Sequence, residues 1–550
     1  MAFLKLLSMK FTKFQLFLLC FVIIQIATGQ IKNDNVSKVW VADNGNGTYK
    51  NPILYADYSD PDAIRVGDDY YMTASSFNCI PGLPILHSKD LVNWKIIGYA
   101  LQQQKPLEVF NKVQHGNGVW APCIRYHNNE FYIYYPDPDF GIYQIKAKKA
   151  EGPWSEPVMV KEGKGLIDPT PLWDEDGKVY LAYAFAGSRA GIKSQLAICT
   201  MNSEGTVANN DDVMIIDGHA DENTIEGPKF YKRNGYYYIF APAGGVATGW
   251  QTVMRSKNVY GPYEKRKVMD QGKSTVNGPH QGAWVQTQTG EDWFIHFQDQ
   301  FVYGRVVHLQ PMKWENDWPV IGVDDDKNGI GEPVTTFRKP NVGKKSFPIE
   351  TPAESDEFNL PKLGLQWQWH ANPQITWGFP TSMGYYSLNC IPVPKEATTL
   401  YQIPNLLLQK MPSNEFTATA KIKFNPRFDG ESMGLVVMGL DYSYICFKQE
   451  GGKLYLSQKT AKNVDKKGVE TETKPISVSN QNLYLQVKVK PGGICTFYYS
   501  ENGNDFTPIG EAFTAKEGKW IGAKIGFFAL RQGIINDAGN VAIDWFRITK

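Results

Sequence analysis

The chain has 550 residues, and its charges almost cancel, with 57 Lys plus Arg against 56 Asp plus Glu. There is thus no basic field of the kind that binds nucleic acid, and we expect a neutral partner instead. A single hydrophobic core seldom serves more than about 250 to 300 residues, so the length requires at least two domains.

Residues 1–29 have the features of a secretory signal peptide. Three lysines precede an apolar run at 16–26, and small residues follow it at 27–29. The run is shorter than the about 20 apolar residues that a membrane span needs. We therefore expect cleavage before Gln30 and a secreted or periplasmic protein with no membrane partner. A lipid anchor at Cys20 is an alternative, but Leu19 precedes it where a small residue is expected.

The remaining cysteines are scattered along the chain without the short spacing of metal ligands. They are Cys79, Cys123, Cys199, Cys390, Cys446 and Cys495. This pattern predicts free, buried thiols and neither a disulfide framework nor a Cys–His zinc site.

The first half of the chain contains an internal repeat, in which a polar motif precedes an aromatic strand. The five copies begin with Asp60-Pro61, Ala121-Pro122, Asp168-Pro169, Glu226-Gly227-Pro228 and His280-Gln281-Gly282. Tight-turn sequences such as Arg233-Asn234-Gly235 separate most motifs from their strands, which is typical of β-hairpins. The copies start about 47 to 61 residues apart, a length that suits one four-stranded blade each. We predict a five-bladed β-propeller over residues 30–323, with a β-sandwich with long loops as the alternative.

The second half has a different pattern. Residues 324–353 are polar and rich in Gly, Pro and Lys, which indicates a linker. Segments after it alternate apolar and polar residues, as in Phe416 to Ile422 and Leu483 to Val489. Half-buried antiparallel sheets produce such alternation, so we predict a β-sandwich over residues 354–550.

Three of the five repeats begin with an acidic residue: Asp60, Asp168 and Glu226. Blades bring their innermost strands to a common axis, so these side chains can converge. Glycosidic cleavage needs one carboxylic acid for the leaving oxygen and a second carboxylate, about 6.5 to 9.5 Å away when that carboxylate activates a water. A third carboxylate raises the pKa of the acid by repulsion. Acidic residues before Pro or Gly are also ordinary turn formers, but their recurrence at equivalent positions favours a catalytic role.

The ordered motifs resemble glycoside hydrolase family 43, the β-xylosidases and α-L-arabinofuranosidases, over essentially the whole mature chain. Besides the five repeat starts, the stretches that carry the resemblance are Asn51-Pro52-Ile53-Leu54, Arg65-Val66-Gly67-Asp68-Asp69-Tyr70-Tyr71, the run from Pro81 to Trp94, Trp120-Ala121-Pro122, Gly304-Arg305, Asp356-Glu357-Phe358 and Leu365-Gln366-Trp367-Gln368-Trp369. The resemblance implies an all-β protein, in which a five-bladed propeller precedes a concanavalin-like accessory sandwich.

The resemblance also implies an inverting mechanism and assigns the three carboxylates. Asp60 matches the general base of the family and Glu226 its general acid. Asp168 matches the carboxylate that orients the acid and tunes its pKa. No cofactor is required for this chemistry.

Four further residues match the substrate-binding part of the family's site. Arg305 matches an arginine that holds sugar hydroxyls or Asp60, and otherwise is a surface ion-pair residue. His280 matches a histidine near the propeller axis that in some relatives helps to hold a structural calcium, and otherwise is an interior histidine. Phe77 and Trp120 are candidates for the pocket wall, or else ordinary core aromatics.

We expect an exo-acting enzyme that releases pentose from arabinoxylan, arabinan or xylo-oligosaccharides. An α-L-arabinofuranosidase is the first choice, with β-xylosidase close behind. The segment Phe77-Asn78-Cys79-Ile80 departs from the Glu-Trp-Phe stretch that many xylosidases carry after the equivalent phenylalanine. An endo-arabinanase and a non-catalytic propeller that binds sugar are the alternatives. The accessory sandwich is either a sugar-binding module or a structural brace.

Overall fold

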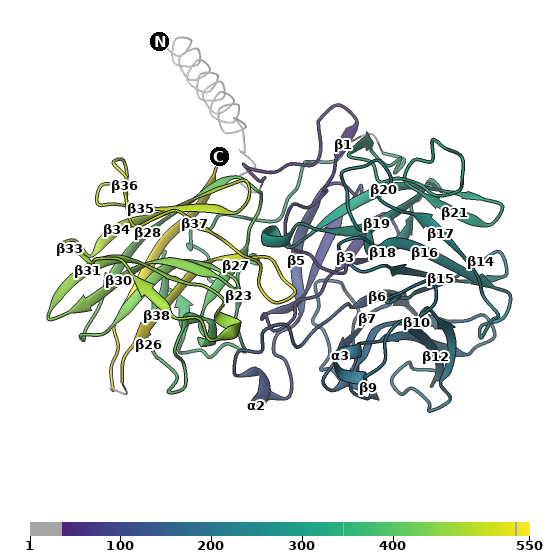
Figure 1. Cartoon of the computed structure of the whole chain (residues 1–550), viewed down its shortest axis with the longest axis horizontal. Helices are drawn as coiled ribbons and strands as arrows, with labels where there is room; N and C mark the ends of the chain where they lie inside the picture. Colours follow the sequence, from purple (N-terminus) through teal and green to yellow (C-terminus); the bar gives the residue numbers. More distant parts are fainter. Residues whose placement is uncertain (1–35, 345, 534–535) are drawn as a thin grey trace, which may run out of the picture. The chain divides into compact units, whose positions relative to one another are not determined.

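The computed structural model describes residues 36–344, 346–533 and 536–550, so the predicted signal peptide lies outside the described residues (Figure 1). Residues 37–550 form one compact unit. Its helices are single turns: α2 (Leu107–Phe110), α3 (Gly187–Ala190), and the 3-10 helices η1 (Phe301–Tyr303), η2 (Leu400–Gln402) and η3 (Val464–Lys466). No helix in the described part is long and apolar enough to cross a membrane. The predicted all-β class is confirmed.

Each sequence repeat forms one four-stranded antiparallel blade, and its strands follow one another in chain order (Figure 1, purple to teal). The blades are β2 (Asp62–Val66), β3 (Asp69–Thr73), β4 (Gly82–Ser88) and β5 (Trp94–Leu101); β6 (Cys123–His127), β7 (Glu130–Asp137), β8 (Gly141–Ala147) and β9 (Val158–Glu162); β10 (Leu166–Trp173), β11 (Val179–Phe185), β12 (Gln195–Met201) and β13 (Val213–Asp217); β14 (Lys229–Arg233), β15 (Tyr236–Ala243), β16 (Trp250–Ser256) and β17 (Glu264–Met269); β18 (His280–Gln286), β19 (Asp292–Asp299), β20 (Arg305–Glu315) and β21 (Trp318–Ile321). This arrangement confirms the five-bladed propeller.

The first strand of each blade lies beside that of a neighbouring blade, in the order β18, β2, β6, β10, β14. These five strands surround the propeller axis, and the polar repeat motifs lie at their beginnings. The axis therefore collects the side chains that the repeat places there.

The first and last parts of the propeller segment pair with each other. Strand β1 (Thr48–Lys50) pairs with β22 (Thr336–Arg338), and Leu54 bridges Val307 of β20. Strand β22 falls within the segment predicted to be a linker, so this segment contributes backbone pairing to the propeller side. The predicted domain limits themselves stay predictions.

The C-terminal half forms two antiparallel sheets (Figure 1, green to yellow). The nine-stranded sheet holds β23 (Gln368–Trp369), β26 (Ile391–Pro392), β27 (Leu407–Lys410), β29 (Ser432–Met438), β30 (Tyr442–Glu450), β31 (Lys453–Ala461), β32 (Glu470–Glu472), β33 (Ile476–Val478) and β38 (Lys524–Arg531). In this sheet, β26 pairs with β38 in parallel. The eight-stranded sheet holds β24 (Gly378–Pro380), β25 (Tyr386–Asn389), β28 (Phe416–Asn425), β34 (Asn482–Lys490), β35 (Ile494–Ser500), β36 (Thr507–Pro508), β37 (Phe513–Thr514) and β39 (Asn540–Thr549).

The two sheets pack face to face over an apolar core. Along β28, alternate residues are buried, as the sequence pattern predicts for a strand with one face in a core. The buried members of β28, β34 and β39 join those of β29 and β38 in one hydrophobic cluster. The predicted β-sandwich is confirmed.

The sandwich shares its core with the propeller. Val302 and Tyr303 of the propeller belong to the same hydrophobic cluster as the sandwich sheets. Trp369 of β23 exchanges two backbone hydrogen bonds with Ile80, at 3.0 and 2.6 Å. Lys524 of β38 donates to Cys79 Sγ at 3.0 Å. The accessory domain thus packs on the segment that contains Phe77, a predicted wall residue.

Candidate active site

Asp60 lies directly before β2, and its side chain is almost fully buried. Three side chains donate hydrogen bonds to its carboxylate: Ser59 Oγ at 2.7 Å, Ser75 Oγ at 2.5 Å and Arg305 Nη1 at 3.1 Å. Arg305 Nη1 also donates to Ser59 Oγ at 2.7 Å, and the Arg305 backbone N–H donates to Asp57 at 2.9 Å. A carboxylate with a guanidinium and two hydroxyl donors is held in one orientation as a charge-assisted acceptor.

Asp168 lies in β10 and is 2% exposed. Its Oδ2 accepts hydrogen bonds from the backbone N–H of Gly227 at 2.7 Å and from Gln281 Nε2 at 3.2 Å. Burial, and then the negative charge of Asp60, raise the pKa of Asp168 to about 7 against the opposing effects of these donors and of Lys229. Asp168 therefore interacts with the starts of the fourth, fifth and first blades.

Glu226 lies before β14 and keeps 33% of its side-chain surface accessible. Burial, followed by the charges of Asp168 and Asp60, raises the pKa of Glu226 to about 8, even though a third of the side chain remains accessible. Arg305 opposes this rise. A carboxyl group with such a pKa carries its proton at neutral pH, which is what a general acid requires.

The backbone is unusual at these positions. Asp60 and Asp168 have left-handed φ values of 54° and 57°, and Gly227 and Gln281 have values of 61° and 32°. The pairing register breaks within β10 at Asp168 and within β18 at Gln281. Left-handed non-glycine residues and β-bulges are strained features that re-aim side chains, and they concentrate at functional sites. A Cβ on Gly227 would lie 2.7 Å from the Gln281 side chain, so the glycine allows this close packing.

His280 lies 3.5 Å from Glu226, between its Nε2 and Oε1. Burial, followed by repulsion from Arg305, lowers the pKa of His280 to about 3, so its imidazole is neutral. Neither ring nitrogen has a hydrogen-bond partner among the described residues. The structure therefore places His280 beside Glu226, and both ring nitrogens of His280 lack a hydrogen-bond partner in the part of the chain that the structure describes.

The calcium that the family resemblance implies near His280 stays a prediction. Ca²⁺ takes six to eight oxygen ligands, whereas the described residues contain no group of three or more His, Cys, Asp or Glu side chains that could hold a metal. The six cysteines of the described residues are free and buried, as predicted.

The two predicted wall residues lie on adjacent segments. Phe77 exchanges backbone hydrogen bonds with Val119 at 2.8 and 3.1 Å, which places Trp120 next to this pair. Phe77 is 3% exposed, so its side chain is mainly core. The Trp120 ring meets the Trp520 ring edge-on at 6.2 Å, and the Arg189 guanidinium lies 5.4 Å from the Trp120 ring centre. Trp520 comes from the sandwich and is 44% exposed, so both domains contribute aromatic surface here.

Sequence reasoning missed several of these contacts. Ser75 and Trp520 carry no sequence signal, because each reaches the site only through the fold. Ser59 and Gln281 lie next to Asp60 and His280 in the sequence. Their hydrogen-bonding side chains could have indicated that they belong to the site.

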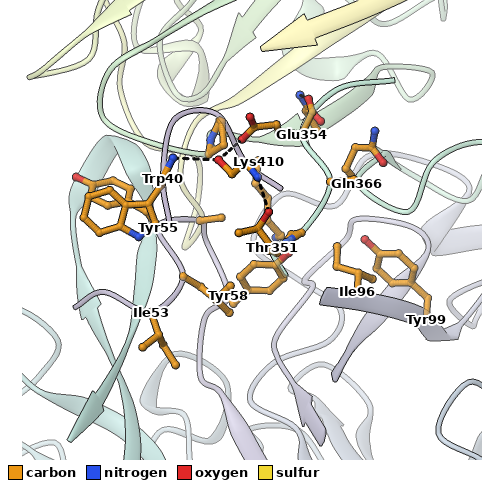
Figure 2. A pocket seen from close by; sticks show the side chains of 17 residues that line it. Trp40, Ile53, Tyr55, Tyr58, Ile96, Tyr99, Thr351, Glu354, Gln366 and Lys410 are labelled. Atoms are coloured by element: carbon orange, nitrogen blue, oxygen red, sulfur yellow. Dashed lines mark hydrogen bonds between the residues drawn. The ribbon is translucent and has the colours of Figure 1, made fainter. Parts of the chain in front are cut away.

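A small cavity lies apart from these residues (Figure 2). It has about 50 Å³ of room, and Trp40, Tyr55, Tyr58 and Lys410 are among its lining residues. Lys410 Nζ lies 5.1 Å from the Tyr58 ring centre, and burial lowers the pKa of Lys410 to about 8. None of the predicted site residues lines this cavity. Its size suits a few water molecules, and it is too small for a sugar ring.

Two family models match the chain. Glycosyl hydrolases family 43 matches residues 49–319, and the beta xylosidase C-terminal concanavalin A-like domain matches residues 355–549. The two matches together span the propeller and the sandwich.

Curated and solved relatives agree with these matches. A putative beta-xylosidase of Xylanibacter ruminicola is 39% identical over 89% of this chain and 88% of its own length. A non-reducing end alpha-L-arabinofuranosidase of Bacteroides ovatus is 30% identical over 91% and 94%. A crystal structure of a family 43 protein mutant from Bacillus licheniformis superimposes with a TM-score of 0.78, at 29% identity over 91% of this chain and 99% of that one. The fold, the arrangement of carboxyl groups and these relatives together show that the chain belongs to glycosyl hydrolase family 43 and is a glycoside hydrolase of the β-xylosidase and α-L-arabinofuranosidase type.

Proposed function

We propose that this enzyme is an inverting exo-glycosidase that releases single pentose units, β-D-xylose or α-L-arabinofuranose, from plant cell-wall polysaccharides or oligosaccharides. The observation that carries the proposal is the contrast between two carboxyl groups on different blades. Glu226 has its pKa raised to about 8, whereas Asp60 accepts hydrogen bonds from a guanidinium and two hydroxyls. One group is equipped to give a proton and the other to take one.

In the proposed reaction, Glu226 donates its proton to the glycosidic oxygen while Asp60 accepts a proton from a water molecule. The oxygen of that water bonds to the anomeric carbon from the opposite side as the carbon–oxygen bond to the leaving group breaks. The products are two hydroxyl compounds, and the released pentose has inverted configuration. Proton exchange with solvent then restores a protonated Glu226 and an ionised Asp60.

Asp168 and Arg305 have supporting roles in this proposal. The charge of Asp168 raises the pKa of Glu226, which keeps the acid protonated at neutral pH. Arg305 holds Asp60 at 3.1 Å and so fixes the direction in which the base faces its water.

The exo mode is supported by the sandwich contribution to the site. Trp520 and Trp120 meet edge-on, and the sandwich packs on the segment after Phe77. An endo-acting enzyme needs an open groove on both sides of the cleaved bond. Such flanking contacts favour a closed pocket that accepts a chain end.

The names of relatives support both pentoses. One relative is named a putative beta-xylosidase and another an alpha-L-arabinofuranosidase. An activity assay is therefore needed to identify which pentose the enzyme releases. Purified enzyme is incubated with an aryl β-D-xyloside and an aryl α-L-arabinofuranoside side by side. Release of aryl alcohol from at least one supports the proposal. Failure on both, with cleavage of internal bonds in arabinan or with binding alone, would select an alternative instead.

Stereochemistry tests the mechanism separately. Proton NMR of the anomeric signal in the first minutes of hydrolysis, before mutarotation, should show the inverted sugar first. Appearance of the retained anomer first, or a glycosyl group trapped on Asp60, would overturn the assignment of Asp60 as base.

We also propose that the enzyme acts outside the cytoplasm. This proposal is based only on the sequence of residues 1–29. N-terminal sequencing of the exported protein should begin at Gln30. A mature protein that still begins at Met1 would contradict this.

A further inference from the structure

The five innermost strands of the propeller begin near the catalytic carboxyl groups, and a second pocket lies at their other ends. It has a volume of about 420 Å³ and is lined by three residues from each of β2, β6, β10, β14 and β18. These residues follow Asp60, Asp168, Glu226 and His280 by three to six positions. At about 3.3 Å per strand residue, the pocket lies roughly 10 to 20 Å from the carboxyl groups along the axis.

A buried layer of charges separates the two sites. Asp62, which is fully buried, accepts a hydrogen bond from Arg125 Nη1 at 2.8 Å and lies 3.8 Å from Lys229 Nζ. Lys229 is 1% exposed and donates to the carbonyl of Pro122 at 3.1 Å. Along β2 and β14, Asp62 and Lys229 stand between the carboxyl groups and the residues that line the pocket.

The pocket is lined by cations and by no acidic side chain. Arg65, Arg125 and Lys232 belong to its wall. Lys232 is paired with Asp174 and Glu175 outside the wall. Arg125 and Lys229 share the single carboxylate of Asp62, which leaves two cations for one carboxylate there. The hydrogen bonds of Arg65 go to the carbonyls of Gln286 and Gly67, at 2.7 and 2.8 Å. The resulting positive potential favours an anionic ligand.

Flat aromatic faces accompany the cations. His127 stacks on Trp173, with ring centres 4.6 Å apart and planes at 11°. The Tyr126 ring is 40% exposed in the same wall. Aromatic faces pack against the apolar faces of sugar rings, and a guanidinium such as that of Arg65 binds carboxylate oxygens. A volume near 420 Å³ falls within the range of small-ligand pockets.

We propose that this pocket is a non-catalytic binding site for a uronic acid, a sugar that carries a carboxylate, on the polysaccharide that the enzyme degrades. The source of the uronic acid rests on the proposed function, but the binding itself does not. Arg65 meets the carboxylate, and the aromatic wall meets the sugar ring. Binding there holds the enzyme on an acidic polymer and raises the effective concentration of chain ends at the catalytic site.

The test measures binding by the full chain carrying Glu226→Gln, so that no substrate is consumed. The probes are a xylo-oligosaccharide with one glucuronic acid branch and the unbranched neutral oligosaccharide of equal length, both followed by calorimetry. Arg65→Gln is added to this background, with Arg65→Lys as the conservative variant. Lys453→Gln removes one exposed charge from the sandwich as a matched control.

Arg65→Gln should weaken binding of the acidic probe about tenfold or more, and Arg65→Lys less. Lys453→Gln should leave binding unchanged, and Tyr126→Ala should weaken it with the charge intact. The neutral probe should bind alike with and without the substitutions at Arg65. Equal binding of the acidic probe with and without Arg65, or equal losses for both probes, would overturn the inference. If the enzyme with Glu226 intact lacks pentosidase activity, while binding of the acidic probe still depends on Arg65, the proposed function is contradicted and the binding site is supported.

Discussion

The axis of the propeller and the core of the sandwich are both made of antiparallel strands, yet they bury opposite kinds of side chain. The axis encloses Asp60, Asp168, Lys229 and His280, whereas apolar side chains fill the space between the two sandwich sheets. Two facing sheets interdigitate along their whole length, so alternate apolar residues fill the space between them. At the axis the first strands of the five blades lie together, and the beginnings of these strands leave room that polar side chains occupy. The raised pKa values of Asp168 and Glu226 follow from that enclosure.

Removal of the sandwich should have the largest effect on solubility and activity. Residues 30–350 expressed alone should be insoluble or inactive, because removal of the sandwich exposes Val302 and Tyr303 and strips Ile80 of two backbone hydrogen bonds. Soluble yield and turnover are compared with those of the full mature chain. A soluble fragment with full activity would show that the propeller does not depend on the sandwich.

Changes at the axis should affect chemistry and leave folding intact. Glu226→Gln and Asp60→Asn each remove a proton-transfer group at almost constant volume, so turnover should fall by about 10² to 10⁴ or more. The midpoint of thermal unfolding should hardly change. Retention of more than about a tenth of the wild-type turnover by either variant would remove that residue from its role.

Asp168→Asn separates tuning from proton transfer. The Asp168 charge raises the pKa of Glu226, so its removal lowers that pKa and Glu226 loses its proton at lower pH. The basic limb of kcat/KM should therefore move to lower pH, and substrates with a good leaving group should lose least. Asp176→Asn, at an exposed turn of the same blade, is the control. An unchanged pH profile for Asp168→Asn would count against the tuning role.

The smallest effect concerns Lys410, a buried cation beside the small cavity. The pKa of Lys410 is about 8 in the folded protein, below its ordinary value of 10.5, so the unfolded chain binds more protons between these values. Stability contributed by this residue therefore rises with pH across that window. Lys410→Met should raise the free energy of unfolding by about 2 kcal/mol at pH 7, after discounting for partial exposure. The gain should shrink above pH 8 and vanish near pH 10.5.

Calorimetric or denaturant unfolding at pH 7 and pH 10 tests this prediction, with the exposed Lys423→Met as control. A gain that is the same at both pH values would mean that packing, and not charge, is responsible. A loss of stability at pH 7 would show that Lys410 has partners that compensate its burial.

Much of the architecture could be predicted from local pattern. The five polar motifs with their hairpin turns predicted five blades, and the alternation after residue 354 predicted the sandwich. Both signals are local, because a blade is one continuous segment and a strand alternates by geometry. The acidic starts Asp60, Asp168 and Glu226 followed from the same repeat.

The partners of those residues could not be predicted in the same way. Arg305 contacts Asp60 from the fifth blade, Gln281 contacts Asp168, and Trp520 of the sandwich meets Trp120. Each pair joins segments far apart in the chain, so no local pattern reports it. The neutral state of His280 and its position beside Glu226 likewise depend on residues far apart in the chain.

The number of blades, the sandwich pattern and the residue types at the start of each inner strand follow from periodicity and turn chemistry within short segments, so the amino-acid sequence is enough to predict them. The neighbours of each carboxyl group, and hence its protonation state, are known only from the folded chain. A pKa depends on burial and on charges within a few ångströms, and in this chain those charges come from three different blades.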